Sequence, residues 1–333
     1  MLRLQPYAYH RPGTVADAAR LLAEHAGDAM IIAGGTDLVP NMKHRLFTPG
    51  HVVALKNIAE LRGIEVRGGA LEIGATESLT TISRHPLVRM HAPSLAEAAG
   101  LIAGPQLRNM GTIGGNICLD TRCTYYNQTW FWRQALGFCL KKDGDVCHVT
   151  KTGKKCVAAH SADTPPVLMT LGASVDLESS QGSRTVPVAD LFITDGIWNS
   201  VRQPDEILVR VRVPVPPART RMAFRKLRQR NAIDFPLLNV AVAVDENENG
   251  TITDVRLVVS ALGSRPRLVS GLDRIVAGRQ LNEDVIDEIA QRAHAQCHPL
   301  TNIIVDTDWR RAMVPVYVRR ALEALRPAAL HAA

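Results

Sequence analysis

Apolar and polar positions follow two different periods along this chain, which predicts a mixture of short helices and short strands. In residues 14–26, Val15, Ala18 and Leu22 recur at helical spacing, and Thr14 with Asp17 three positions later is typical of a helix N-cap. Further helices are predicted over 95–102, 283–296 and 309–325, and strands over 30–32, 51–56, 71–73, 239–244 and 255–262. The alternation predicts an α+β protein with small subdomains.

One long segment breaks this pattern. Residues 119–161 have no clean period but contain six of the 15 aromatic residues of the chain. An irregular stretch of this length is usually functional or disordered, and its aromatic content argues against disorder. Farther along, Pro214, Pro216 and Pro217 mark a boundary. We therefore expect one domain over residues 1–217, with an insert at about 119–161, and a second over residues 218–333.

Composition narrows the class of protein. The chain has 333 residues, of which 46% are apolar and 21% charged, as in an ordinary globular protein. No apolar run approaches the ~20 residues of a membrane span, and the first residues lack a signal-peptide core, so a cytoplasmic location is expected. The net charge is +7, but no basic stripe interleaved with aromatics indicates nucleic-acid binding. Residues 119–161 carry seven basic and three acidic side chains, which fits either an acidic protein partner or a solvated loop.

The cysteines gather in the irregular segment. Five of the six fall between positions 118 and 156. In the cytosol, clustered cysteines bind metal or carry out redox chemistry more often than they form disulfides. Structural zinc sites usually use CxxC-like pairs, and none occurs here. The spacing therefore favours an iron–sulfur centre and leaves zinc open.

Two glycine-rich turns precede the cysteines. Residues 33–37 read Ala-Gly-Gly-Thr-Asp after a predicted strand, and residues 111–116 read Gly-Thr-Ile-Gly-Gly-Asn. Glycines let backbone N–H groups approach a phosphate. Neither turn matches the GxGxxG dinucleotide pattern or the P-loop, and each alone is weak because most Gly-Gly pairs are only tight turns. Two such turns are able to hold one pyrophosphate from two sides.

Taken together, the two turns resemble the flavin motifs of the FAD-binding subunits of molybdenum hydroxylases, the family of xanthine dehydrogenase. Residues 32–38 are similar to the first motif and residues 108–117 to the second. Residues 163–168 resemble a D-x-x-P-x-L stretch, Lys226, Arg230 and Asp234 resemble a K-x-x-x-R-x-x-x-D segment, and residues 309–311 resemble a Tyr-Arg-Arg motif, with Trp309 in place of the tyrosine.

The resemblance implies an FAD-binding domain of the vanillyl-alcohol-oxidase-like (PCMH) type, with subdomains 1–57 and 58–217. A C-terminal domain of the CO dehydrogenase flavoprotein type would follow. It also implies a set of residues that contact FAD: Ile31, Ile32, Ala33, Gly34, Gly35, Thr36, Asp37, Leu38, Ile102, Thr112, Gly114, Gly115, Asn116, Asp120, Asp163 and Lys226. No catalytic residue is implied, because the substrate reacts on another subunit.

The cysteine-rich insert resembles one branch of this family. The β subunit of 4-hydroxybenzoyl-CoA reductase carries an additional [4Fe–4S] cluster on a similar insert, and residues 118–128, 137–141 and 144–149 look like that branch. A cubane needs four thiolates, which by this resemblance are Cys123, Cys139, Cys147 and Cys156. Cys118 is expected to be a buried free thiol, Cys297 a core residue, and His148 a hydrogen-bonding neighbour rather than a ligand.

The resemblance implies an electron-transfer function. Electrons from ferredoxin would pass through [4Fe–4S] and FAD to [2Fe–2S] and molybdopterin subunits of an (αβγ)2 complex, with Lys141, Lys142, Lys154 and Lys155 docking the donor. The complex would remove the phenolic hydroxyl of 4-hydroxybenzoyl-CoA. Two alternatives stay open: the FAD subunit of a hydroxylase that oxidises a purine or another heterocycle, and a zinc-stapled scaffold without enzymatic activity.

Overall fold

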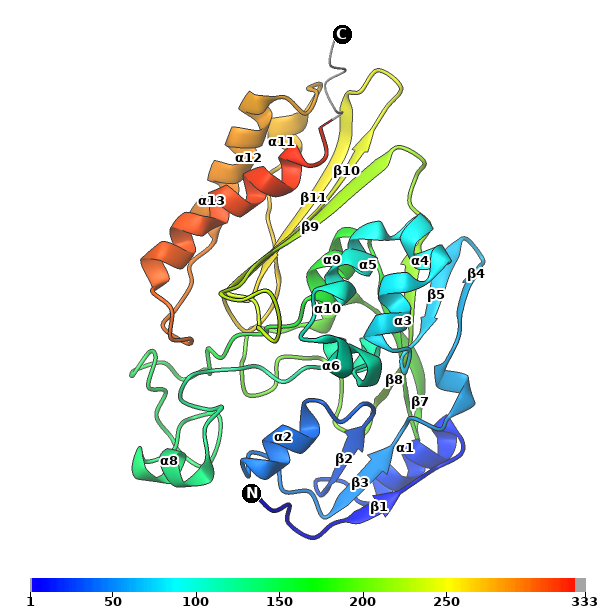
Figure 1. Ribbon diagram of the computed structural model, residues 1–333, viewed down its shortest axis with the longest axis vertical. Coiled ribbons are helices and arrows are strands. Elements are labelled where there is room, and N and C mark those ends of the chain that lie inside the picture. Colours follow the sequence, from blue (N-terminus) through cyan, green and yellow to red (C-terminus); the bar gives the residue numbers. More distant parts are fainter. Residues whose placement is uncertain (1, 327–333) are drawn as a thin grey trace.

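Three β-sheets organise the chain, each with its own set of helices (Figure 1). The computed structural model describes residues 2–326; Met1 and residues 327–333, at the ends of the two expected domains, lie outside the described part. The strand orders are β1-β3-β2, β4-β5-β8-β6-β7 and β12-β11-β10-β9. Helices alternate with strands in the small parallel sheet, whereas the other two sheets are antiparallel, so the α+β prediction is confirmed.

The first sheet is small and parallel. It contains β1 (Ala8–His10), β2 (Ala29–Ile32) and β3 (His51–Ala54), with α1 (Val15–Glu24) against it and α2 (Leu38–Lys43) after β2. The predicted N-cap is confirmed, because Thr14 Oγ1 accepts a hydrogen bond from the Asp17 amide at 3.1 Å. The carboxyl end of β2 runs directly into the first glycine turn.

The second sheet is antiparallel, and most of the helices that precede residue 218 belong to the same part of the chain. Its strands are β4 (Ile64–Arg67), β5 (Ala70–Gly74), β6 (Ser174–Ser179), β7 (Gly182–Pro187) and β8 (Ile207–Pro214). The short helices are η1 (Ala59–Leu61), α3 (Leu79–Arg84), α4 (Pro86–His91), α5 (Pro93–Gly100), α6 (Pro105–Met110), α7 (Ile113–Ile117), α9 (Thr164–Thr170) and α10 (Val188–Leu191). One apolar core joins this sheet to α3, α5 and α9.

The third sheet connects the two halves of the molecule. It contains β9 (Thr220–Leu227), β10 (Leu238–Glu246), β11 (Ile252–Ser260) and β12 (Arg267–Leu268), with α11 (Asp273–Val276), α12 (Glu283–Gln296) and α13 (Thr307–Glu323) on one face (Figure 1). Strand residues alternate between faces. Val240 and Val242 belong to the core with α12 and α13, whereas Ala241 belongs to the core with α5 and α9. Both faces of β10 are therefore buried.

The cysteine-rich insert projects from the side of the molecule, with α8 (Trp130–Ala135) as its one helix (Figure 1). It is mostly loop, as the sequence predicts. Its Arg133 is 1% exposed and donates a hydrogen bond to the Arg45 carbonyl at 2.9 Å, and Tyr126 packs on Leu46. These contacts hold the insert against the end of α2. Within residues 2–326, no helix is long and apolar enough to cross a bilayer.

Candidate functional site: a flavin cradle beside a cysteine-lined cavity

The first glycine turn leaves the parallel sheet at the end of β2. Ile31 and Ile32 are strand residues, Ala33 to Thr36 form the turn, and Asp37 precedes the buried Leu38, which begins α2. Gly35 has a φ of +70°, a left-handed conformation that favours glycine. Its carbonyl accepts a hydrogen bond from the Val39 amide at 3.1 Å, which fixes the path into α2.

The second glycine turn enters the short helix α7. Thr112 Oγ1 accepts a hydrogen bond from the Gly115 amide at 3.1 Å. The Gly114 amide donates to the Ala75 carbonyl at 2.9 Å, and a Cβ on Gly114 would lie 2.9 Å from that oxygen. Asn116 Oδ1 accepts from the amide and the hydroxyl of Thr164 at 3.1 and 2.7 Å. The turn is therefore fixed on both sides.

The two turns touch each other, although about 80 residues separate them. A Cβ placed on Gly34 would lie 1.9 Å from the carbonyl oxygen of Met110 and 2.9 Å from the Gly111 nitrogen. Real Cβ atoms do not approach backbone this closely. Gly34 is thus required for the contact that brings the two motifs together.

A cavity of about 220 Å³ lies where the turns meet. Ala33 and Thr112 contribute to its wall from the two motifs. The other lining residues are Lys56, Arg62, Thr76, Glu77, Ser78, Thr81, Asn109 and Met110. Two cations and several hydroxyl groups around close-approach glycines suit a pyrophosphate. Sequence reasoning missed Lys56 and Arg62; the signal was the position of Lys56 just after a parallel strand, at the same sheet edge as the first turn.

A buried ion pair joins the two halves behind the second turn. Lys226 Nζ donates to Asp163 Oδ2 at 2.8 Å and to the Leu101 carbonyl, next to Ile102, at 3.2 Å. Asn239, opposite Lys226 in the β9–β10 register, donates to Asp163 Oδ1 at 2.9 Å. Burial raises the pKa of Asp163, and the Lys226 ammonium opposes that shift. The structure thus groups Asp163, Lys226 and the segment at Ile102.

A second charged group lies between the first turn and the insert. Lys141 Nζ donates to Asp120 Oδ1 at 2.6 Å, and Arg122 Nη1 donates to Asp37 Oδ1 at 3.4 Å. The Arg122 guanidinium also lies 4.1 Å from the centre of the Phe235 ring. Burial raises the pKa of Asp37 to about 6, opposed by the charge of Arg122. Asp37 and Asp120 therefore bridge the flavin motif to the cysteine segment.

The four predicted thiolate ligands meet at one cavity in the insert. Cys123, Cys139, Cys147 and Cys156 all line it. The remaining wall is formed by Tyr125, Tyr126, Leu140, Lys141, His148, Val149, Val157 and Ala158. Burial, with the neighbouring thiols, raises the pKa of Cys123 to about 11. Among residues 2–326 no carboxylate lines the cavity, so its possible ligand atoms are the four sulfurs and the His148 imidazole, with one ammonium beside them.

Backbone groups are directed at two of these sulfurs. The Ala158 amide donates to Cys156 Sγ at 3.4 Å. Burial acts to raise the pKa of Cys147, but hydrogen bonds from Thr150, Val149 and Val157 outweigh it and lower that pKa. N–H donors that stabilise a thiolate are typical of sites where the sulfur is a ligand.

Four expectations about the insert and the remaining cysteines are resolved. Cys118 does not line the cavity, but it is exposed rather than buried, because the turn that ends α7 faces solvent. Lys141 is wrong as a docking residue, since its side chain is 4% exposed and paired internally with Asp120. His148 lines the cavity and its ring hydrogen-bonds the Phe138 carbonyl at 2.5 Å, and Cys297 is buried in the C-terminal core.

Comparison with known families agrees with this geometry. Residues 5–216 match the family described as the FAD binding domain in molybdopterin dehydrogenase, and residues 222–325 match the CO dehydrogenase flavoprotein C-terminal domain. The chain belongs to the FAD-binding subunits of the molybdenum hydroxylase family. The fold class expected from the resemblance is thereby confirmed.

Individual relatives of this FAD subunit match along nearly their whole length. The carbon monoxide dehydrogenase medium chain of Hydrogenophaga pseudoflava is 30% identical over 320 residues, or 96% of each chain. The putative xanthine dehydrogenase FAD-binding subunit of Escherichia coli is 27% identical and covers 95% of this chain and 94% of its own. A structure of the Hydrogenophaga pseudoflava carbon monoxide dehydrogenase superposes with a TM-score of 0.81 and 28% identity, covering 97% and 98% of the two chains.

The residues present in the FAD subunit fit its cofactor. At the contact between Gly34 and Met110, any Cβ would overlap the backbone. Lys56 and Arg62 line the cavity next to this contact. Residues 33–36 would hold the pyrophosphate through backbone N–H groups, and the second turn would add the Thr112 hydroxyl, because the Gly114 and Gly115 N–H groups are already bonded within the protein. When bound, FAD supplies one- and two-electron redox chemistry, and the protein orients it and excludes water.

The buried His160 makes the stability of this subunit sensitive to acid. It is fully buried, and burial lowers its pKa to about 4 from an ordinary 6.5, with the nearby Ile117 backbone acting in the opposite direction. Below pH 6.5 the His160 side chain is protonated in the unfolded chain, but it stays neutral in the folded chain down to about pH 4. The free energy of unfolding therefore falls as the pH drops from 6.5 toward 4. When the pH is lowered from 7.5 to 5.0, we expect the free energy of unfolding of the wild type to fall by about 2 kcal/mol more than that of His160→Leu, as measured by urea unfolding. Equal losses would contradict this assignment.

Proposed function

We propose that this chain is the FAD- and [4Fe–4S]-bearing electron-transfer subunit of a molybdenum-dependent, ferredoxin-driven 4-hydroxybenzoyl-CoA reductase. It would relay electrons from ferredoxin through the cluster and FAD to partner subunits that carry [2Fe–2S] and molybdopterin. Removal of the phenolic hydroxyl as water consumes two electrons and two protons. The chain itself would hold cofactors and bind no aryl-CoA.

One observation carries this proposal: the cavity lined by Cys123, Cys139, Cys147 and Cys156 is linked to the first flavin motif by two ion pairs. Lys141 lines that cavity and pairs with Asp120 at 2.6 Å. Two residues on, Arg122 pairs with Asp37 of the first glycine turn at 3.4 Å. The family match supports FAD alone, so the cluster rests on the cysteines of this chain.

The spread of the sulfurs argues against a zinc staple. In tetrahedral zinc sites with Zn–S bonds of 2.3 Å, sulfurs lie about 3.8 Å apart. Across residues 2–326, no three of the four Sγ atoms lie within 4.8 Å of one another. A cubane separates its thiolates more widely because each binds a different iron. The four sulfurs of the described chain are therefore not arranged for a tetrahedral zinc ion.

The hydroxylase alternative is supported by the named relatives, which include a carbon monoxide dehydrogenase and a putative xanthine dehydrogenase subunit. In that function the same FAD would pass electrons outward from substrate oxidation. Either function requires partner subunits, since the relative is a medium chain. We propose an (αβγ)2 complex in the cytoplasm for this chain.

Cofactor analysis of the anaerobically purified complex is the direct test. We expect one non-covalent FAD with about four iron and four sulfide attributable to this chain. The ultraviolet–visible spectrum and chemical iron and sulfide assays measure this after the chain is separated under native conditions. FAD without iron would favour the hydroxylase alternative, and zinc without flavin would favour the scaffold.

Ferredoxin docking should depend on exposed lysines of the insert. Lys151, Lys154 and Lys155 are exposed, so they are available to attract an acidic donor. We expect Lys154→Ala/Lys155→Ala to slow stopped-flow reduction by ferredoxin on the order of fivefold at low salt. The difference should shrink toward 1 M salt, where the Debye length is about 3 Å.

The matched control for this charge change is Arg219→Ala/Arg274→Ala. Both arginines are exposed and belong to the C-terminal half, on the β8–β9 connection and α11. This variant should keep the wild-type rate at both salt concentrations. If both double variants slow the reaction equally, net charge rather than a docking surface on the insert controls the rate.

A further inference from the structure

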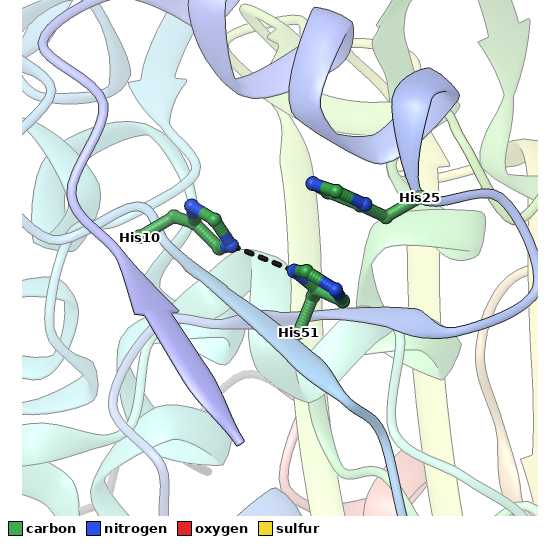
Figure 2. A group of neighbouring side chains, drawn as sticks. All are labelled: His10, His25 and His51. Carbon is green, nitrogen blue, oxygen red and sulfur yellow. Dashed lines mark hydrogen bonds between the residues drawn. The ribbon is translucent and has the colours of Figure 1, made fainter.

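Three histidines from separate segments lie together beside the parallel sheet, away from both cofactor sites (Figure 2). His10 ends β1, His25 follows the last residue of α1, and His51 begins β3. None of the three lines the flavin cavity or the cysteine cavity. Each ring is half-buried, so one edge of the group is open to solvent.

The rings are close enough to share one ion. A nitrogen from each histidine lies within 4.8 Å of a nitrogen from the other two. His10 Nε2 and His51 Nδ1 are hydrogen-bonded at 2.9 Å, as the dashed line in Figure 2 marks. The His25 and His51 rings are stacked, with centroids 3.6 Å apart and planes 11° apart.

We propose that His10, His25 and His51 form a binding site for one divalent transition-metal ion. Neutral imidazole is a preferred ligand of Zn²⁺, Ni²⁺ and Cu²⁺. Three imidazoles leave a fourth position for water, a known arrangement for zinc. The group contains no carboxylate, so hard cations such as Mg²⁺ and Ca²⁺ are poor candidates.

The rearrangement needed to bind the ion is small. With metal–nitrogen bonds of about 2.0–2.1 Å, tetrahedral ligands lie about 3.3–3.4 Å apart. The hydrogen-bonded pair at 2.9 Å would open by about half an ångström, and the shared proton would move to the other nitrogen of its ring so that both facing nitrogens can bind the ion. The stacked His25 and His51 rings would have to fan out so that their lone pairs converge. The backbone already brings the three rings together, so the proposal asks for side-chain rotation and no movement of the sheet.

The site would act as a staple between the end of β1, the end of α1 and the start of β3. His51 pairs with Ala29, the first residue of β2, whereas the flavin turn follows the last residue of that strand. β1 is only three residues long and pairs with β3 alone, so it is a weak edge element. An ion between His10, His25 and His51 would tie β1 and the end of α1 to β3. Because it would bind the folded state, it would raise thermal stability.

The test is titration of the intact holo complex with Ni²⁺ in metal-free buffer, followed by calorimetry. The variants are His10→Gln, His25→Gln and His51→Gln, with His91→Gln as control because His91 is also half-buried but lies at the end of α4. We expect one tight Ni²⁺ equivalent in wild type and His91→Gln, and at least tenfold weaker binding in each trio variant. Absence of binding to wild type, or unchanged affinity in the trio variants, would overturn the site.

A measurement on wild type alone covers the case in which a variant does not fold. X-ray absorption at the nickel edge should show a shell of nitrogen or oxygen neighbours with imidazole scattering and no sulfur. Sulfur in that shell would assign the ion to the cysteines and overturn the proposal. Added Ni²⁺ should also raise the melting temperature of wild type, and an unchanged melting temperature at saturating Ni²⁺ would contradict the staple.

Discussion

Alanine at position 34 is expected to empty the flavin site while leaving most of the fold intact. A Cβ there would lie 1.9 Å from the Met110 carbonyl oxygen and 2.5 Å from its carbon. Both neighbours are backbone, so the two glycine turns must separate. Overpacking costs about 1–3 kcal/mol, and the severity of this overlap points to the upper end. We expect FAD binding about a hundredfold weaker in Gly34→Ala, measured by flavin fluorescence on dilution.

Alanine variants of two other glycines serve as comparisons for Gly34→Ala. Gly13→Ala should keep full FAD occupancy, because Gly13 belongs to the same subdomain and nothing lies within 4 Å of its added Cβ. Gly35→Ala should fall between them, since its φ is +70° but its nearest neighbours are side-chain atoms at 3.2 and 3.4 Å. Circular dichroism checks that each variant folds. Full flavin content in a folded Gly34→Ala protein would mean that the contact between the turns does not shape the cofactor site.

Replacement of Cys139 by alanine is expected to cost the subunit its cluster and its ferredoxin-driven activity. Cys139 is 7% exposed and lines the cavity with the other three thiols. Removing one of four thiolates leaves an iron without its ligand. We expect loss of most iron and sulfide, retention of FAD, and a fall in ferredoxin-driven turnover on the order of a hundredfold or more. Reduction by small artificial donors, which reach the flavin directly, should persist.

Cys118→Ala is the matched control, because Cys118 is exposed and absent from the cavity wall. It should retain iron, sulfide and ferredoxin-driven turnover. Ordinary ferredoxin-driven rates in an iron-free Cys139→Ala protein would place the cluster off the electron path, and loss of iron in Cys118→Ala would revise the ligand set. Iron and sulfide assays on both variants precede the kinetics.

The regular elements were predictable because their signals are local. Residues 283–296 bury Val285, Ile286 and Ile289 at helical spacing behind the Asn282 cap, and the structure begins and ends this helix at the predicted residues. The seven buried residues in a row at 238–244 read as a strand for the same reason. Periodicity and caps depend on neighbours in the sequence, so no tertiary information was needed.

The parts of the site that depend on long-range contacts were not predictable. Lys56 and Arg62 carry no motif, and only the fold brings them to the cavity with Thr112. Lys141 looked like a surface charge in a basic loop, but tertiary folding buries it on Asp120. Cys118 looked buried because it follows a glycine-rich core motif. For the three cationic side chains, contacts with residues distant in sequence decide the environment.

The chain leaves the ribosome from its N-terminus, and this order limits when its cofactor sites can be complete enough to bind their cofactors. Asp163 needs Lys226 and Asn239, and the insert needs Asn302, which donates to the Val157 carbonyl at 2.8 Å. Asn302 is in turn held by Arg310 of α13, at 3.4 Å. Domains usually fold as they emerge, N-terminal parts first, yet here the first half of the chain is completed by contacts from its last third. Cofactor loading should therefore be a late, post-translational event in the life of each molecule.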